Sequence, residues 1–127
     1  MNPQAMKDPD EITLDVFGKI LYALAMADGA IQEQEIKELE KIVEQDKWAH
    51  RIKLSFDRAM RLEMDPKIVF FKNMRILQTL KYDQHMPYFV NLMERMASAY
   101  NGIIPAERDM ISRFQDHFRE NARLAYL

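Results

Sequence analysis

Oxygen-bearing side chains cluster around two glycine turns in the sequence. Asp28 and Glu35 flank the first turn, and Asn101 and Glu107 flank the second. Carboxylate and carbonyl oxygens are hard ligands of the kind that calcium, magnesium and manganese prefer. If the fold brings the two turns together, we expect a divalent cation to be bound by Asp28, Glu35, Asn101 and Glu107. Because Asn101 is neutral, the expected affinity is low, with a dissociation constant of roughly 10⁻⁴–10⁻³ M.

Helix capping is the alternative explanation of these residues. The side chain of Asp28 can accept amide hydrogens just beyond it, and Glu35 can cap the helix that follows. A carboxylate at a helix C-terminus is disfavoured by the helix dipole, so Asp28 needs either those amides or a cation. Capping alone would account for the residues, and the cation site is a hypothesis that goes beyond it.

The first turn matches only the second half of an EF-hand calcium loop. Asp28 and Glu35 fall on the fifth and twelfth positions of such a loop. The first and third positions would be Leu24 and Met26, which carry no carboxylate. A calcium loop of that type is therefore not predicted.

No arrangement typical of an enzyme is apparent. The histidines have no partner at a recognised zinc spacing, and we expect surface positions for His50, His85 and His117. The serines lie inside helical patterns and lack a nucleophile elbow: Ser55, Ser98 and Ser112. The chain has no cysteine, which excludes thiol nucleophiles and thiolate zinc sites. We therefore expect no catalytic activity.

Helices must position these residues, because the composition favours an all-α fold. The chain of 127 residues has the length of one domain, and its three glycines and five prolines are too few for many short strands. No apolar run approaches the length of a membrane span, and the N-terminus lacks the apolar region of a signal peptide. We expect a cytoplasmic protein in which residues 1–7 form a flexible tail.

Apolar residues at helical spacing predict about six helices. The first begins at the cap signal Asp8-Pro9-Asp10-Glu11, the fourth at Asp65-Pro66 and the last at Pro105. The fifth runs to Asn101. The fourth helix carries apolar residues over a wide arc, so we expect it to be the most buried. These residues are Ile68, Val69, Phe70, Phe71, Met74, Leu77 and Leu80.

The charged residues separate into an acidic helix and a basic one. The second predicted helix is strongly acidic on its exposed side, and the segment from Lys47 to Arg61 is basic. Cations that flank an apolar helical stripe are typical of a solvated helix face. With a net charge of −2 for the whole chain, we expect no nucleic-acid binding.

The two turns belong to a degenerate internal repeat. When Asp28 is aligned with Asn101, the apolar residues before the turns coincide, Phe17, Ile20 and Leu24 with Val90, Met93 and Ala97. Beyond the turns, Glu35 aligns with Glu107 if the second loop is one residue shorter. We therefore predict a bundle with two pseudo-symmetric helix-turn-helix hairpins, whose turns can lie at one end.

At these turns the sequence resembles the TerB-like family, the tellurite-resistance-associated helical domains also related to the N-terminal region of the DjlA co-chaperones. The residues that carry the resemblance are Ala27-Asp28-Gly29-Ala30-Ile31 with Glu35, and Tyr100-Asn101-Gly102-Ile103-Ile104 with Glu107. The resemblance covers nearly the whole of residues 1–127 as one domain. It implies an all-helical bundle, an association with stress-response systems and an acidic surface that binds divalent cations. Asn101 departs from the family pattern, which has an aspartate there.

The function expected from the sequence is that of a non-catalytic TerB-like binding module in a stress-response system. Such a module would bind calcium, magnesium or manganese weakly at the acidic turns, and its partner would be another protein. The alternative is a metal-free interaction scaffold whose acidic second helix docks a basic partner. The sequence leaves the oligomeric state open.

Overall fold

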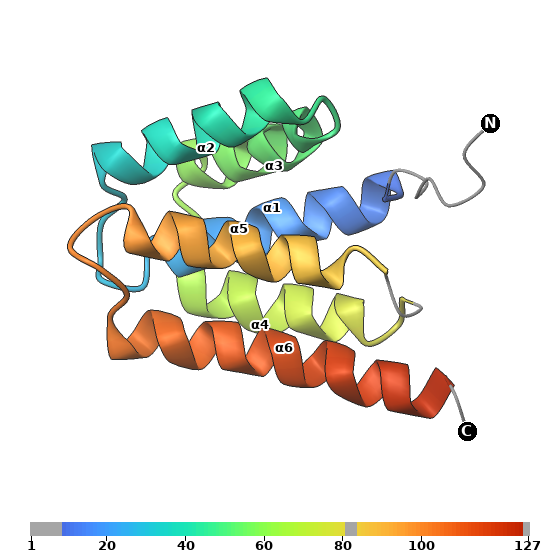
Figure 1. The fold of residues 1–127 in the computed structure, drawn as a ribbon. Coiled ribbons are helices and arrows are strands. Elements are labelled where there is room, and N and C mark those ends of the chain that lie inside the picture. The colour runs from blue at the N-terminus through green and yellow to red at the C-terminus, as the bar shows by residue number, and fades with distance from the viewer. Residues whose placement is uncertain (1–8, 81–83, 126–127) are drawn as a thin grey trace.

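The structure of the protein is a computed structural model that describes residues 9–80 and 84–125, with side chains described as far as residue 117. Its described residues form six helices and no strand, which confirms the predicted all-α bundle (Figure 1). The helices are α1 (Glu11–Ala25), α2 (Glu33–Gln45), α3 (Ala49–Arg61), α4 (Pro66–Leu77), α5 (Met86–Ser98) and α6 (Pro105–Ala125). The predicted flexible tail, residues 1–7, lies outside the described residues.

The first helix, α1, is the centre of the bundle. Most of its side chains are buried, and it packs mainly against α3 and α4 while also contacting α5 and α6. The prediction that the fourth helix is the most buried is therefore wrong. In α4, Ile68 and Phe71 are 65% and 60% exposed, because α1 covers one face of α4 and leaves the other to solvent.

Aromatic side chains join α1 to both halves of the bundle. The ring of Phe17 stacks on Phe89 of α5 at a centroid distance of 4.4 Å and lies 5.7 Å from Phe114 of α6. On the side of α3, the ring of Tyr22 meets Phe56 edge-on at 6.2 Å. Such contacts add to the stabilisation that burial of the rings already provides.

Local capping rules place most helix starts correctly. Asp65 is the N-cap of α4, and its Oδ1 accepts hydrogen bonds from the amides of Lys67 and Ile68 at 2.9 and 3.1 Å. The N-cap of the first helix lies two residues later than the predicted cap at Asp8. Asp10 is its N-cap, because an extended backbone lets its Oδ1 accept the amide of Thr13 at 2.8 Å.

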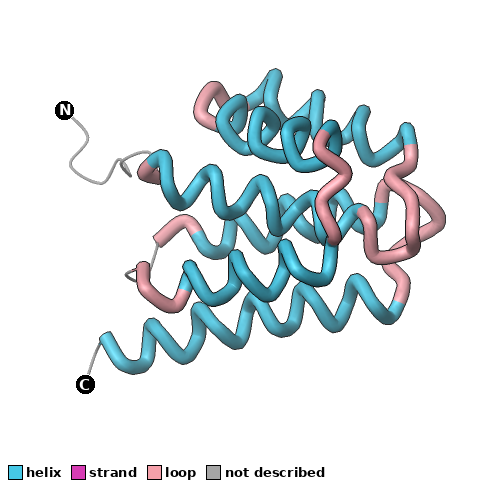
Figure 2. Tube along the Cα trace, turned by 180° about the vertical axis from the view of Figure 1, so that it is seen from behind, coloured by secondary structure: helices cyan, strands magenta, loops and turns pink. Residues whose placement is uncertain are grey.

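The two hairpins have their turns at the same end of the bundle. Figure 1 shows the α1–α2 and α5–α6 connections side by side, and the rear view in Figure 2 agrees. The helices after the turns pack differently, since α2 lies against α3 and α5, whereas α6 lies mainly against α5. The fifth helix ends at Ser98 and not at Asn101, because the turn takes the intervening residues.

No helix in the described part of the chain combines the length and apolar composition needed to cross a membrane.

The helices α1 and α3 approach each other closely at Gly18. A Cβ atom at Gly18 would lie 2.5 Å from the carbonyl oxygen of Ile52 and 2.5 Å from the Cβ of Ser55. Across the same contact, the Ser55 hydroxyl donates a hydrogen bond to the carbonyl of Asp15 at 2.6 Å. This glycine is therefore required by helix packing, in contrast to the two turn glycines.

Replacing Gly18 with alanine should lower the free energy of unfolding by about 1–3 kcal/mol, because the added methyl group overlaps the α3 backbone. In a helix without that contact, the same change would raise stability by about 1 kcal/mol. Urea unfolding measures the difference, and Ser112→Ala on the exposed side of α6 is the control expected near zero. An unchanged or raised urea midpoint for the Gly18 variant would contradict the close approach.

Candidate functional site

Left-handed backbone conformations form both turns. Gly29 has a φ of 96°, and Gly102 has a φ of 77°. Asn101 also has a positive φ, 53°, which asparagine tolerates better than most residues. In the first turn, Oδ1 of Asp28 accepts the amide of Ala30 at 3.2 Å, which confirms the predicted Asx-type turn.

Two glutamates occupy equivalent positions after the turns, in the first turns of α2 and α6. Oε1 of Glu35 accepts a hydrogen bond from the backbone amide of Gln32 at 2.8 Å. In the same way, Oε1 of Glu107 accepts the backbone amide of Ile104 at 3.0 Å. Each side chain reaches back to the residue before its helix, as in the glutamate half of a capping box. The capping role predicted for Glu35 is therefore confirmed, and Glu107 makes the equivalent contact in α6.

Both glutamates are buried. Glu35 is 3% exposed and Glu107 is 5% exposed. Carboxylates are rarely buried to this extent unless an opposite charge, a metal or a set of hydrogen bonds compensates for the lost hydration. Among the described residues, neither glutamate forms an ion pair with a lysine, arginine or histidine.

The two turns are electrostatically coupled. Burial raises the pKa of the Glu35 carboxyl to about 7, against the lowering effect of the Gln32 amide, and the negative charges of Glu107 and Asp28 add to the rise. Burial also raises the pKa of Glu107, against the effect of the Ile104 amide, and Asp28 again contributes. Such coupling requires the carboxylates of the two turns to lie near one another. We refer to Asp28, Glu35 and Glu107 as the acidic cluster.

The structure therefore brings three of the four predicted ligands into one region. Glu35 and Glu107 lie in the interior, whereas Asp28 and Asn101 lie exposed in the turns. Within the described residues, however, no group of three or more histidine, cysteine, aspartate or glutamate side chains is arranged to hold a metal ion. The cluster thus offers hard oxygen ligands without a complete coordination sphere.

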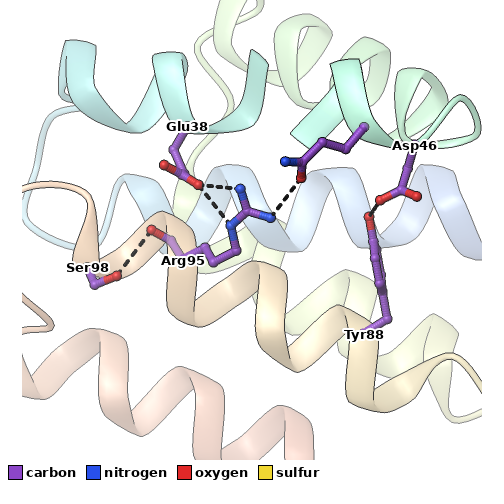
Figure 3. Close-up of polar contacts among 6 residues, drawn as sticks. Glu38, Asp46, Tyr88, Arg95 and Ser98 are labelled. Atoms are coloured by element: carbon purple, nitrogen blue, oxygen red, sulfur yellow. Dashed lines mark hydrogen bonds and ion pairs between the residues drawn. The ribbon is translucent and has the colours of Figure 1, made fainter. Parts of the chain in front are cut away.

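Polar contacts between α2 and α5 escaped the sequence analysis. Arg95 binds Oε2 of Glu38 through Nε at 2.8 Å and through a terminal nitrogen at 2.6 Å (Figure 3). Further along, the Tyr88 hydroxyl donates a hydrogen bond to the carboxylate of Asp46, and burial together with that contact raises the pKa of Tyr88. Only opposite charge could have suggested the Arg95 pair, because its members are far apart in sequence.

The expectation of surface histidines is wrong for His85. This residue is 8% exposed, and its ring centroid lies 6.1 Å from that of Trp48 and 6.3 Å from that of Phe89. It is the N-cap residue of α5, and its ring is buried because it packs against Trp48 and Phe89. His50 is exposed, as expected, and His117 is partly exposed.

Comparisons with protein-family models, curated proteins and solved structures found no match to this chain. The resemblance to the TerB-like family consequently rests on the residues of the two turns and stays a prediction. The all-α bundle of six helices is shown by the structure itself.

The raised pKa of Glu35 predicts that stability falls as the pH rises. The folded state holds the proton with a pKa of about 7, above the ordinary value of 4.5, so this contribution is complete below pH 4.5 and is lost as the pH passes through 7. Glu35→Gln keeps an oxygen for the Gln32 amide and removes the charge. The variant should exceed wild type by about 1–3 kcal/mol at pH 8 and match it near pH 4.5.

Urea unfolding from pH 4 to pH 8 in buffer with EDTA measures this effect. The matched control is Glu33→Gln, because Glu33 lies in the first turn of the same helix but is exposed. If the stability of the Glu35 variant parallels wild type across the range, Glu35 is not an uncompensated buried acid.

Valine in place of Gly29 should destabilise the protein by about 1–2 kcal/mol, because a β-branched residue is strained at positive φ. A Cβ at this position meets no atom within 4 Å, so the effect would come from the backbone alone. Gly29→Asn should cost less, since asparagine accepts left-handed conformations. Gly102→Val should destabilise the protein by a similar amount, because Gly102 also has a positive φ. Equal urea midpoints for the valine and asparagine variants would argue against left-handed turns.

Proposed function

We propose that the protein is a non-catalytic binding module of the TerB-like type that binds a divalent cation weakly at its paired glycine turns. The observation that supports this proposal is the pair of buried glutamates, Glu35 and Glu107, neither of which has an ion-pair partner among the described residues. Buried carboxylates need a compensating proton or positive charge. A bound cation would supply that charge to both at once.

The donor set fits a hard cation. In each glutamate, one oxygen binds the amide before its helix, and the other accepts no hydrogen bond from the described residues. Asp28 and Asn101 add a carboxylate and a carbonyl from the exposed turns. Calcium, magnesium and manganese take such oxygen ligands and accept water at the remaining positions. Binding would be weak because the described side chains do not complete a coordination sphere.

A proton and a cation would compete for this site. With a pKa of about 7, Glu35 is partly protonated at neutral pH, and a cation must displace that proton. Affinity should therefore rise as the pH increases from 6 to 8. This coupling distinguishes the buried cluster from a collection of surface carboxylates, which are already ionised over that range.

The remainder of the proposal follows from the sequence resemblance. The TerB-like pattern of the turns supports a place in a stress-response system and a protein partner. Nucleic acid is a poor candidate for that partner, because the net charge is −2 and two of the four cations of α3 are engaged within the protein. Arg51 pairs with Glu11 at 3.1 Å, and Lys53 pairs with Asp57 at 2.6 Å.

The alternative is a metal-free scaffold whose acidic α2 docks a basic partner. The internal pairing of α2 gives this alternative less support. Glu38 is engaged by Arg95 at 2.6 Å, and Glu33 pairs with Lys37 at 3.2 Å. Glu40 and Glu44 remain exposed without an ion pair among the described residues. Much of the acidic charge therefore serves the fold or is balanced on the helix itself.

Calorimetric titration with calcium, magnesium and manganese tests the proposal. We expect a dissociation constant of roughly 10⁻⁴–10⁻³ M for at least one ion at pH 8, and weaker binding at pH 6. Saturation should raise the melting temperature, because the ion binds only the folded state. Asn101→Asp should strengthen binding by adding a carboxylate, and Glu35→Gln or Asp28→Asn should abolish it.

Glu40→Gln is the matched control, because it removes an exposed carboxylate of α2 outside the cluster and should leave the titration unchanged. Absence of heat and of thermal stabilisation at pH 8, for wild type and for Asn101→Asp alike, would contradict the proposal. Capping would then be the whole role of the cluster.

A further inference from the structure

The outer surface of α4 combines exposed apolar side chains with unpaired positive charges. Ile68 and Phe71 are 65% and 60% exposed. The helix carries three cations, Lys67, Lys72 and Arg75, and no carboxylate. None of these cations forms an ion pair with the described residues. The surface lines a shallow depression of about 750 Å³, and we call it the α4 surface: Lys67, Ile68, Phe71, Lys72, Arg75, Ile76 and Thr79.

A groove flanks the α4 surface on each side. One cavity, of about 350 Å³, is lined by Lys19 of α1 together with Ile68, Val69 and Asn73 of α4. The other, of about 440 Å³, is lined by Phe70 and Phe71 of α4, the end of α1 and the first turns of α6, including Met110. The exposed Ile68 and Phe71 thus border two concavities that can receive apolar side chains. Apolar grooves of this kind can receive the apolar face of an amphipathic helix.

A buried polar atom lies at the groove between α1 and α4. Asn73 is 3% exposed, and its Nδ2 donates a hydrogen bond to the carbonyl of Val69 at 2.8 Å, which fixes the orientation of the amide. Its Oδ1 accepts no hydrogen bond from the described residues. Buried acceptors of this kind are rare because leaving them unpaired is costly. Oδ1 is enclosed by the protein, so this unpaired acceptor belongs to the packing of α4 and is not a contact point for a partner.

We propose that the α4 surface docks an acidic amphipathic helix of another protein. The unpaired cations require negative charge on the partner, and the exposed apolar residues with their grooves require a stripe of aliphatic or aromatic side chains. The proposal does not depend on the cation site, which lies at the turns.

Two other occupants fit the α4 surface less well. In a second copy of the chain, the acidic helix α2 exposes no large apolar residue to insert into the grooves. The exposed Leu54 lies on the basic helix α3, so that face would bring cation against cation. An anionic membrane would match the charge of α4, but its headgroups would not place apolar side chains in the two grooves, and the chain as a whole has a net charge of −2.

Peptide binding to the full chain tests the proposal. The probe is a labelled synthetic helix with a leucine stripe and glutamates on both flanks. The comparison peptide replaces the glutamates with lysine. Fluorescence anisotropy should show binding of the glutamate peptide that is at least about 10-fold tighter than that of the lysine peptide.

Variants of the chain locate the binding. Phe71→Ala and Lys72→Glu should each weaken the glutamate peptide by about 10-fold or more, and circular dichroism should show an unchanged fold because both side chains are exposed. The matched controls on α3 are Leu54→Ala and Arg58→Glu, which remove an exposed leucine and reverse an exposed arginine. These controls should bind the peptide as wild type does.

Three outcomes would overturn the proposal. One is no binding of the glutamate peptide at about 1 mM, the weakest affinity such a test resolves. Another is equal weakening by the α3 control variants, which would reveal charge attraction without a site. The third is retention on phosphatidylglycerol vesicles, lost in Lys72→Glu, with no peptide binding, which would make the α4 surface a membrane contact.

Discussion

Burial of α1 is the constraint on which the rest of the structure depends. Most side chains of this helix are buried. Every other helix is therefore positioned either by its contact with α1 or by its contact with a helix that packs against α1. The tightest point is Gly18, where the absence of a side chain lets α3 approach the α1 backbone. On a different face of α1, Phe17 stacks on Phe89 and orients α5. The position of α5 in turn sets where the second turn and α6 can lie.

This arrangement explains why two distant turns form one acidic cluster. Each turn ends a helix that packs into the core, and each is followed by a helix whose glutamate caps its own first turn. Capping alone is a local and favourable interaction at the positive end of a helix. Once the bundle brings the turns together, Glu35 and Glu107 become like charges in a poorly hydrated place. The same residues that stabilise the helices locally thus create a site that favours a proton, and we propose that a cation can take the place of that proton.

Local patterns predicted the turns and the helix starts, whereas tertiary contacts escaped prediction. Gly29 and Asp65 were placed correctly because left-handed turns and N-caps depend on the residue and its immediate neighbours. The repeat correctly suggested that the turns share one end. Ile68 was assigned to the core incorrectly, since apolar spacing does not reveal which face of a helix another helix covers. The pairing of Arg95 with Glu38 has no local signature at all, because it joins separate helices.

The central claim is that Glu35 and Glu107 form a buried, uncompensated pair that a cation can neutralise. Carboxyl ¹³C chemical shifts of the two glutamates, followed by NMR from pH 4 to pH 9, measure this most directly. The titration is carried out in metal-free buffer and repeated with calcium and with magnesium. The account predicts that Glu35 titrates with a pKa of about 7 in metal-free buffer, and that calcium or magnesium lowers this pKa. Titration of Glu35 at its ordinary value near 4.5, unchanged by either ion, would contradict the account.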